Sequence, residues 1–192
     1  MRTNFQISSK EKILWQGGPD LRLSFVEGII NPLLPFAIVW AFVDGFVFAA
    51  GTSSPFMLLF FLLHLMPVWI YLFGVITSGM RAKNTKYVIT DRALYIQKGI
   101  LSIQIERAPL NEIVHTEISL GIIDRIFGLG DVLCICVHGT HKISNIKDYS
   151  EVSAILAQVS EDMYTDTMYP NDYRPGENHG YKTSYRNSEK KL

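Results

Sequence analysis

Apolar residues dominate one long stretch of the chain, between Phe25 and Ile76. These roughly fifty residues contain two acidic side chains and neither Lys nor Arg. Near the middle, the small uncharged residues 49–54 and the following Pro55 interrupt the stretch. An α-helix needs about 20 apolar residues, at a rise of about 1.5 Å each, to cross a bilayer. The pattern therefore predicts two membrane spans joined by a tight turn, which is a transmembrane hairpin.

The two expected spans run from Ile29 to about residue 50 and from Phe56 to about residue 77. Pro32 and Pro35 fall in the first turns of the first span, where a missing N–H costs little. A cleaved signal peptide is a rival interpretation of this region. However, a largely polar region of more than 20 residues precedes the apolar stretch, and the stretch is longer than the apolar core of a signal peptide.

Basic residues lie on both flanks of the apolar stretch and are absent from the loop between the expected spans. They are Arg2, Lys10, Lys12 and Arg22 before it, and Arg81, Lys83, Lys86 and Arg92 after it. Because loops rich in Lys and Arg stay on the cytoplasmic side, both termini are expected to be cytoplasmic. The sequence thus predicts a multi-pass protein of the cytoplasmic membrane.

Two polar residues, Asp44 and His64, lie inside the expected spans. Their distances from the turn differ by about two residues, so their depths differ by only ~3 Å and the two side chains can meet. One interpretation is a proton-sensitive or ligand-coordinating intramembrane pair, since ionisable groups in a membrane are costly. The other is a hydrogen bond that fixes the hairpin, or a carboxylate hydrated near the outer surface.

From Tyr87 onward the apolar residues alternate with polar ones, which is typical of strands. Leu101, Ile103 and Ile105 alternate with polar residues and predict a half-buried strand that ends at Pro109. Further strands are expected at 87–90, 93–97, 113–118, 132–137 and 142–146, and a helical turn at 122–127.

An amphipathic helix is expected to close this region. Asp148 or Ser150 can cap its start, and it is expected to end near Met163. Its apolar residues Val152, Ile155, Leu156 and Val159 recur at helical spacing. Short antiparallel strands closed by one helix predict a mainly-β sandwich or a partly open barrel.

Four segments follow one another in an order that resembles a known family. They are Glu11–Trp15, Tyr87–Ile96 with Lys98–Leu101, Ala108–Ile113, and Ile123–Val132. Together they resemble the bacterial PH (pleckstrin-homology-like) domain family, in its YdbS-like membrane-anchored group. The resemblance spans roughly Glu11 to Val159. It implies a seven-stranded fold with a C-terminal helix, and a short strand ahead of the membrane hairpin.

The expected organisation has four parts. Residues 1–24 form a cytoplasmic segment with a short strand, 25–78 a transmembrane hairpin, 79–163 the PH-like domain, and 164–192 a disordered polar tail. The tail is too polar to bury a core of its own. The fold class is therefore a membrane-anchored mixed protein.

Few residues suggest catalysis, so neither an enzyme nor a cofactor is expected. His115, His138 and His141 have no partners at a diagnostic spacing, and although His138 and His141 flank a turn, no metal site is expected there. Cys134 and Cys136 are interpreted as reduced cysteines. With 18 basic and 18 acidic residues the net charge is zero, which does not suggest nucleic acid as a partner.

The leading functional hypothesis is a non-enzymatic module that binds a protein partner or self-assembles at the membrane. An alternative is anionic-lipid sensing or lipid handling, with Arg81, Lys83 and Lys86 as candidate headgroup contacts, although these residues also serve as topology determinants. The turn Thr90-Asp91-Arg92 lacks the clustered cations with which eukaryotic PH domains bind phosphoinositides. A third hypothesis is a small transporter or channel subunit that uses Asp44 and His64.

Overall fold

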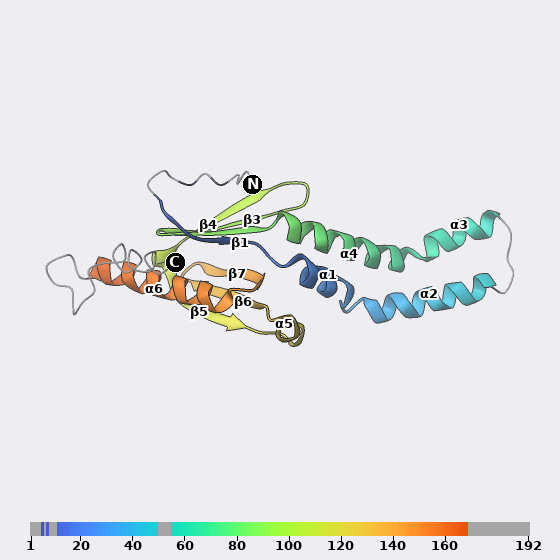
Figure 1. The fold of residues 1–192 in the computed structure, drawn as a ribbon. Coiled ribbons are helices and arrows are strands. Elements are labelled where there is room, and N and C mark those ends of the chain that lie inside the picture. Colours follow the sequence, from blue (N-terminus) through green and yellow to red (C-terminus); the bar gives the residue numbers. More distant parts are fainter. Residues whose placement is uncertain (1–4, 6, 8–10, 50–54, 169–192) are drawn as a thin grey trace. The chain divides into compact units, whose positions relative to one another are not determined.

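The structure is a computed structural model, and it describes residues 5, 7, 11–49 and 55–168. The expected turn at 50–54 and the expected disorder of residues 169–192 lie outside the described residues. The chain forms two compact units (Figure 1). We call Leu21–Lys83 the helical unit, and Met1–Asp20 together with Asn84–Leu192 the strand unit.

The helical unit contains α1 (Leu21–Ile29), α2 (Leu34–Ala49), α3 (Pro55–His64) and α4 (Met66–Asn84). Taken singly, none of the described helices has the length and apolar character that a membrane crossing requires. Two bent pairs meet that requirement by length and composition: α1 with α2, bent by 54°, and Phe56–His64 with α4, bent by 51°. This corrects the expectation of two continuous helices starting at Ile29 and Phe56.

Local chemistry explains both breaks. At the first, the Asn31 side chain accepts a hydrogen bond from the Leu33 N–H (2.8 Å) and donates one to the Gly28 carbonyl (2.8 Å). It thus caps the end of α1 and the start of α2. At the second, Pro67 has no N–H to donate, and the N–H groups of Val68 and Trp69 both turn to the Leu65 carbonyl (2.9 and 3.1 Å).

The helices of this unit touch along a narrow strip. Gly28 of α1 lies so close to Ser78 of α4 that an added Cβ would approach the Ser78 side chain to 2.9 Å. Ala37, Tyr71 and Val75 form a small buried cluster. Most large apolar side chains of the unit remain exposed, among them Phe42, Phe46 and Phe73.

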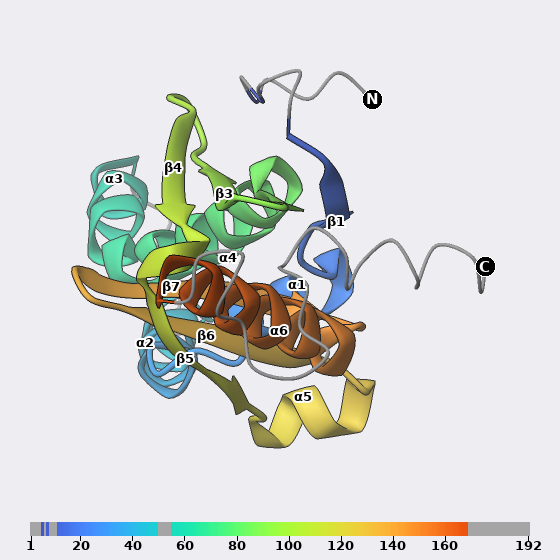
Figure 2. The ribbon, with the colours of Figure 1, turned by 90° about the vertical axis from the view of Figure 1, so that its left-hand side faces the viewer.

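The strand unit consists of two antiparallel sheets and a closing helix (Figure 2). The first sheet has the order β1 (Ile13–Gly17), β2 (Lys86–Thr90), β3 (Ala93–Lys98), β4 (Gln104–Pro109). The second has the order β5 (Ile113–Ser119), β6 (Gly130–Cys136), β7 (Gly139–Ile146). The turn η1 (Leu110–Glu112) joins the sheets, α5 (Ile122–Phe127) links β5 to β6, and α6 (Tyr149–Met168) ends the described chain.

One buried apolar cluster holds both sheets and α6 together. Val152, Leu156 and Val159 of α6 are fully buried in it. They pack with residues of the first sheet, such as Leu94 and Ile96, and of the second sheet, such as Val132 and Ile143. The predicted sandwich closed by a C-terminal helix is therefore the observed architecture of this unit.

Strand β1 covers the region in which the sequence predicts a short N-terminal strand. It pairs antiparallel with β2, with Gly17 opposite Tyr87 and Ile13 opposite Thr90. The chain therefore leaves the strand unit after β1 and returns to it at the neighbouring strand, so that all of Leu21–Lys83 is an insertion between two paired strands.

Two expected element boundaries need correction. The half-buried strand predicted to run from Leu101 to Pro109 begins only at Gln104, and Leu101, Ile103 and Ile105 are exposed. Gly99, at φ 138°, starts a turn in which a Cβ would collide with the Ser102 carbonyl. Helix α6 continues beyond Met163 to Met168, so the first residues of the expected disordered tail are helical. No proline occurs there until Pro170.

Replacement of Leu156 by Ala tests the shared core. The cavity is expected to lower the free energy of unfolding by about 2–5 kcal/mol. Urea unfolding of the full chain in detergent micelles, followed by labelling of the buried Cys134, measures the loss. Val137→Ala removes apolar atoms at an exposed position and should change the midpoint little. Equal shifts in the two variants would contradict the assignment of Leu156 to the core.

Candidate functional site

The structure brings together the two polar residues of the apolar stretch. Nδ1 of His64, at the end of α3, lies 2.8 Å from Oδ1 of Asp44 in α2. Asp44 is only 4% exposed, whereas the His64 side chain is 39% exposed. A buried carboxylate needs such a partner, because an unsatisfied charged group carries a large desolvation cost.

Aromatic rings fix the position of the His64 imidazole. It stacks on Trp40 of α2, with ring centroids 5.1 Å apart, and on Phe60 of α3 at 5.2 Å. The Trp40 indole also donates a hydrogen bond to the His64 backbone carbonyl (2.7 Å). Because the helix breaks at Leu65, this carbonyl lies outside the regular helical pattern, and the indole supplies its donor.

The second carboxylate oxygen of Asp44 is buried and has no hydrogen-bond partner among the described residues. The site thus has one satisfied contact and one open acceptor, which suits either a structural hydrogen bond or a group that binds a proton or a small donor. Sequence reasoning named Asp44 and His64 but missed Trp40 and Phe60. The signal was present, since each aromatic residue precedes its polar neighbour by four positions and shares its helix face.

The three candidate headgroup contacts lie close together along the chain. Arg81 and Lys83 are exposed in the last turn of α4, where cations interact favourably with the helix dipole. Lys86, which begins β2, is half-buried. Arg92 lies at the other end of β2, in the β2–β3 turn, where the Asp91 side chain accepts a hydrogen bond from the Lys12 N–H (3.0 Å).

The histidines and cysteines of the strand unit have separate positions. His141 of β7 lies 3.6 Å from Glu106 of β4, and His115 lies 3.0 Å from Glu117. Within the described residues, no three His, Cys, Asp or Glu side chains gather in a way that could hold a metal ion. Burial raises the pKa of Cys134 to about 12 and also raises the pKa of Cys136. Both thiols are therefore poor nucleophiles at neutral pH.

Strand β5 forms one edge of the second sheet, beside α6. Small α6 residues face it: Ser153 hydrogen-bonds Thr116 (3.3 Å), and the Ser160 hydroxyl donates to the Ile113 carbonyl (2.9 Å). Val114 and Ile118 are exposed on this strand. The strand unit thus presents an edge strand with two exposed apolar side chains next to a helix.

A double-mutant cycle on Asp44 and His64 tests a structural role for the pair. Asp44→Ala and His64→Ala should each destabilise the helical unit, with a coupling energy of about 0.5–3 kcal/mol. Denaturation of the full chain in micelles, followed by tryptophan fluorescence, measures it. Phe42→Ala, at an exposed site on the same helix, is the control. Unchanged stability in both single variants would exclude the structural role and favour the functional one.

Comparison with known proteins places the fold in a family. The family model described as "Bacterial PH domain" matches residues 28–163, well over half of the chain. No curated protein matches the chain, and no solved structure matches it either. The YdbS-like group within the family stays a prediction. The matched range contains β2 to β7 and most of α6, in the order that the sequence resemblance implied, and the chain belongs to the bacterial PH domain family.

Proposed function

We propose that the protein is a non-enzymatic integral membrane protein that presents its PH-like strand unit to a protein partner, or to a second copy of itself, at the cytoplasmic face. PH domains are typically binding modules without catalytic activity, and they interact with proteins or lipids. The observation that carries the proposal is the β5 edge beside α6, with Val114 and Ile118 exposed along it.

Membrane anchoring is supported by the surface of the helical unit. The unit exposes large apolar residues along its whole length, including Phe42, Phe46, Phe73 and Ile76. Exposed apolar area of this extent marks a surface that contacts lipid or another protein. The two bent helix pairs have sufficient apolar length for a bilayer, and the flanking basic residues favour cytoplasmic termini.

Peptide-binding domains often add an extended segment of the partner to an exposed strand edge. Backbone hydrogen bonds then supply affinity, while alternate side chains supply specificity. In β5, His115 and Glu117 alternate with the exposed apolar residues, so the edge carries both charge and apolar surface. This mixture suits a reversible partner better than a permanent core contact.

Anionic-lipid sensing is a second candidate. It is favoured by the exposure of Arg81 and Lys83 at the end of α4 and by the nearby Lys86, each worth about 1 kcal/mol near an anionic surface. Replacing all three cations by Gln distinguishes the two candidates. A lipid sensor then binds anionic vesicles more weakly, whereas a protein-binding module retains its partner.

Photo-crosslinking in native membranes tests the β5 surface. A photoreactive residue at position 114 or 118 should give adducts larger than the monomer, because a partner strand would lie against these side chains. Position 137 is the control, since Val137 is equally apolar and exposed but lies in the β6–β7 turn. Adducts of equal yield at all three positions, or none at 114 and 118, would contradict the proposed surface.

Cysteine labelling in intact cells tests the orientation. A cysteine in place of Ser53 should react with a membrane-impermeant maleimide from outside, because the loop between the spans is expected to be external. A cysteine in place of Val137, which is exposed in the strand unit, should react only after permeabilisation. The reverse pattern would overturn the proposed orientation. Wild-type protein gives the background, since Cys134 and Cys136 are buried.

A further inference from the structure

The strand unit has two distinguishable ends, which its own hydrogen bonds define. At one end lie the last residues before the helical unit and the first ones after it. Here the Asp20 N–H donates to the Asn145 carbonyl (2.8 Å), the Ser144 N–H to the Tyr87 hydroxyl (3.1 Å), and the Asn84 side chain to the Ile100 carbonyl (3.3 Å). We call this the connection end.

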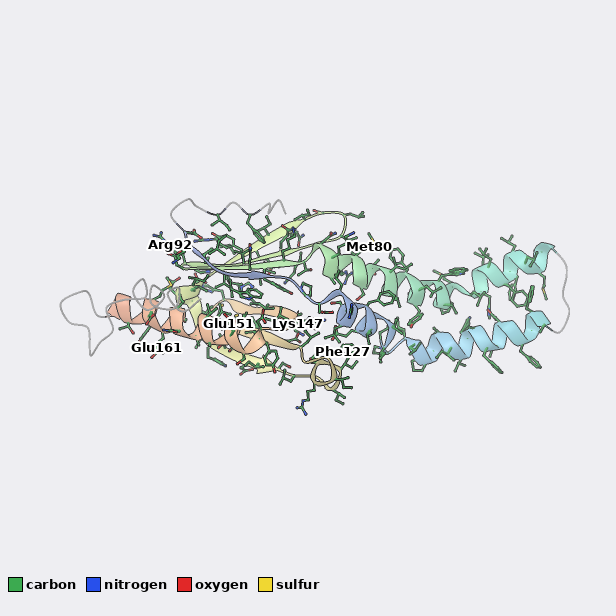
Figure 3. The ribbon with its side chains drawn as sticks, in the orientation of Figure 1. Met80, Arg92, Phe127, Lys147, Glu151 and Glu161 are labelled. Atoms are coloured by element: carbon green, nitrogen blue, oxygen red, sulfur yellow. The ribbon has the colours of Figure 1, made fainter. Side chains whose placement is uncertain are left out.

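The opposite, distal end is tied together by a separate set of contacts. The Leu110 N–H donates to the Arg92 carbonyl (3.0 Å), and the Val137 N–H donates to the Glu112 carbonyl (3.1 Å). Figure 3 shows Arg92 and Phe127 at opposite ends of the strand unit. The β2–β3 turn at Arg92 therefore lies away from the residues that lead into the helices.

Exposed apolar side chains concentrate at the connection end, on two separate elements. Leu101, in the β3–β4 loop, is 98% exposed, and Ile103 follows it. Gln97 of β3 pairs with Lys86, which lies at the connection end. The next residue, Lys98, pairs with Gln104 at the base of the loop, so the loop lies at the connection end as well. The apolar side chains whose alternation predicts a half-buried strand are thus not covered by any other layer of the described residues.

The second element is α5, which follows β5 at Ser119, opposite Asp131. Ile122 and Ile126 are 81% and 75% exposed, and Phe127 is exposed beside them. Asp124 turns inward, where it accepts a hydrogen bond from the Gly121 N–H (2.7 Å). Arg125 lies on the exposed side of α5, so the outer surface of this helix combines apolar groups with a cation and no carboxylate.

We infer that the connection end is a membrane-contacting surface, in which the 100–103 loop and α5 insert into the bilayer interface. The inference rests on the proposed membrane anchoring of the helical unit. Its occupant is the lipid surface itself, because the covalent connections at Asp20 and Asn84 keep this end within a few residues of the anchor. Apolar side chains combined with basic ones are the composition that binds in the interface region of anionic membranes.

Lipid contact also explains why two structurally unrelated elements expose apolar groups at the same end. A protein partner would need to cover both the β3–β4 loop and α5, which belong to different sheets. A bilayer surface reaches both at once, since both lie beside the chain's path into the helices. The distal end carries fewer such residues among those described, with Val137 and Ile13 as examples.

Depth-dependent fluorescence quenching tests the inference. The full chain is reconstituted in vesicles of phosphatidylcholine and phosphatidylglycerol, with an environment-sensitive dye on a cysteine introduced at position 101, 126 or 137. Doxyl-labelled lipids should quench the dye at 101 and 126 several-fold more strongly than at 137. Val137 is the matched control, because it is an apolar residue, 68% exposed, at the distal end. Arg125→Ala should weaken the quenching at 126 in anionic vesicles and not in neutral ones.

A fourth label, at position 73 in α4, separates the two possible failures. Strong quenching there with none at 101 and 126, or equal quenching at 137, would overturn the inference while the anchor stands. Absence of quenching at 73 would overturn the anchor and the inference together. A dye that is shielded from water at 101 and 126 without being quenched would indicate a protein at this surface, and it would also overturn the inference.

Discussion

The antiparallel pairing of β1 with β2 is the constraint on which the rest of the structure depends. These strands are separated in the chain by the entire helical unit, Leu21–Lys83. Closing so long an insertion costs conformational entropy, although the cost grows only by about 0.6 kcal/mol for each doubling of length. The pairing, together with the Asp20–Asn145 hydrogen bond, fixes the two points at which the chain leaves and re-enters the strand unit.

The pairing of β1 with β2 defines two ends of the strand unit. Every strand runs either toward or away from the residues that lead into the helices, so its loops divide into a connection end and a distal end. The exposed apolar residues of the 100–103 loop and α5 belong to the first, whereas the polar Thr90-Asp91-Arg92 turn belongs to the second. The proposed membrane contact uses the connection end, whereas the proposed partner surface is the β5 edge beside α6.

The helical unit is held by few, specific contacts rather than by a large core. The tight approach of Gly28 to Ser78 and the contact of Asp44 with His64 are of this kind. A unit that buries little apolar surface in itself depends on its surroundings for stability. The proposed membrane anchoring places lipid around its exposed Phe and Leu side chains, and the hydrogen bond between the buried Asp44 and the partly exposed His64 joins α2 to α3.

The sequence by itself determined the features that local chemistry controls. Periodicity located the strands and the closing helix, since residues such as Val152 and Leu156 repeat at the spacing of one buried face. Apolar content located the helical unit, and helix geometry predicted that the Asp44 and His64 side chains can meet. Tertiary structure decided the features that a local sequence pattern cannot predict. Leu101, Ile103 and Ile105 alternate like a buried strand face, but they remain exposed because no other layer of the described part of the chain packs against them. The continuity of the helices, the partners of His64 and the shared position of the 100–103 loop and α5 likewise depend on contacts between residues far apart in the chain.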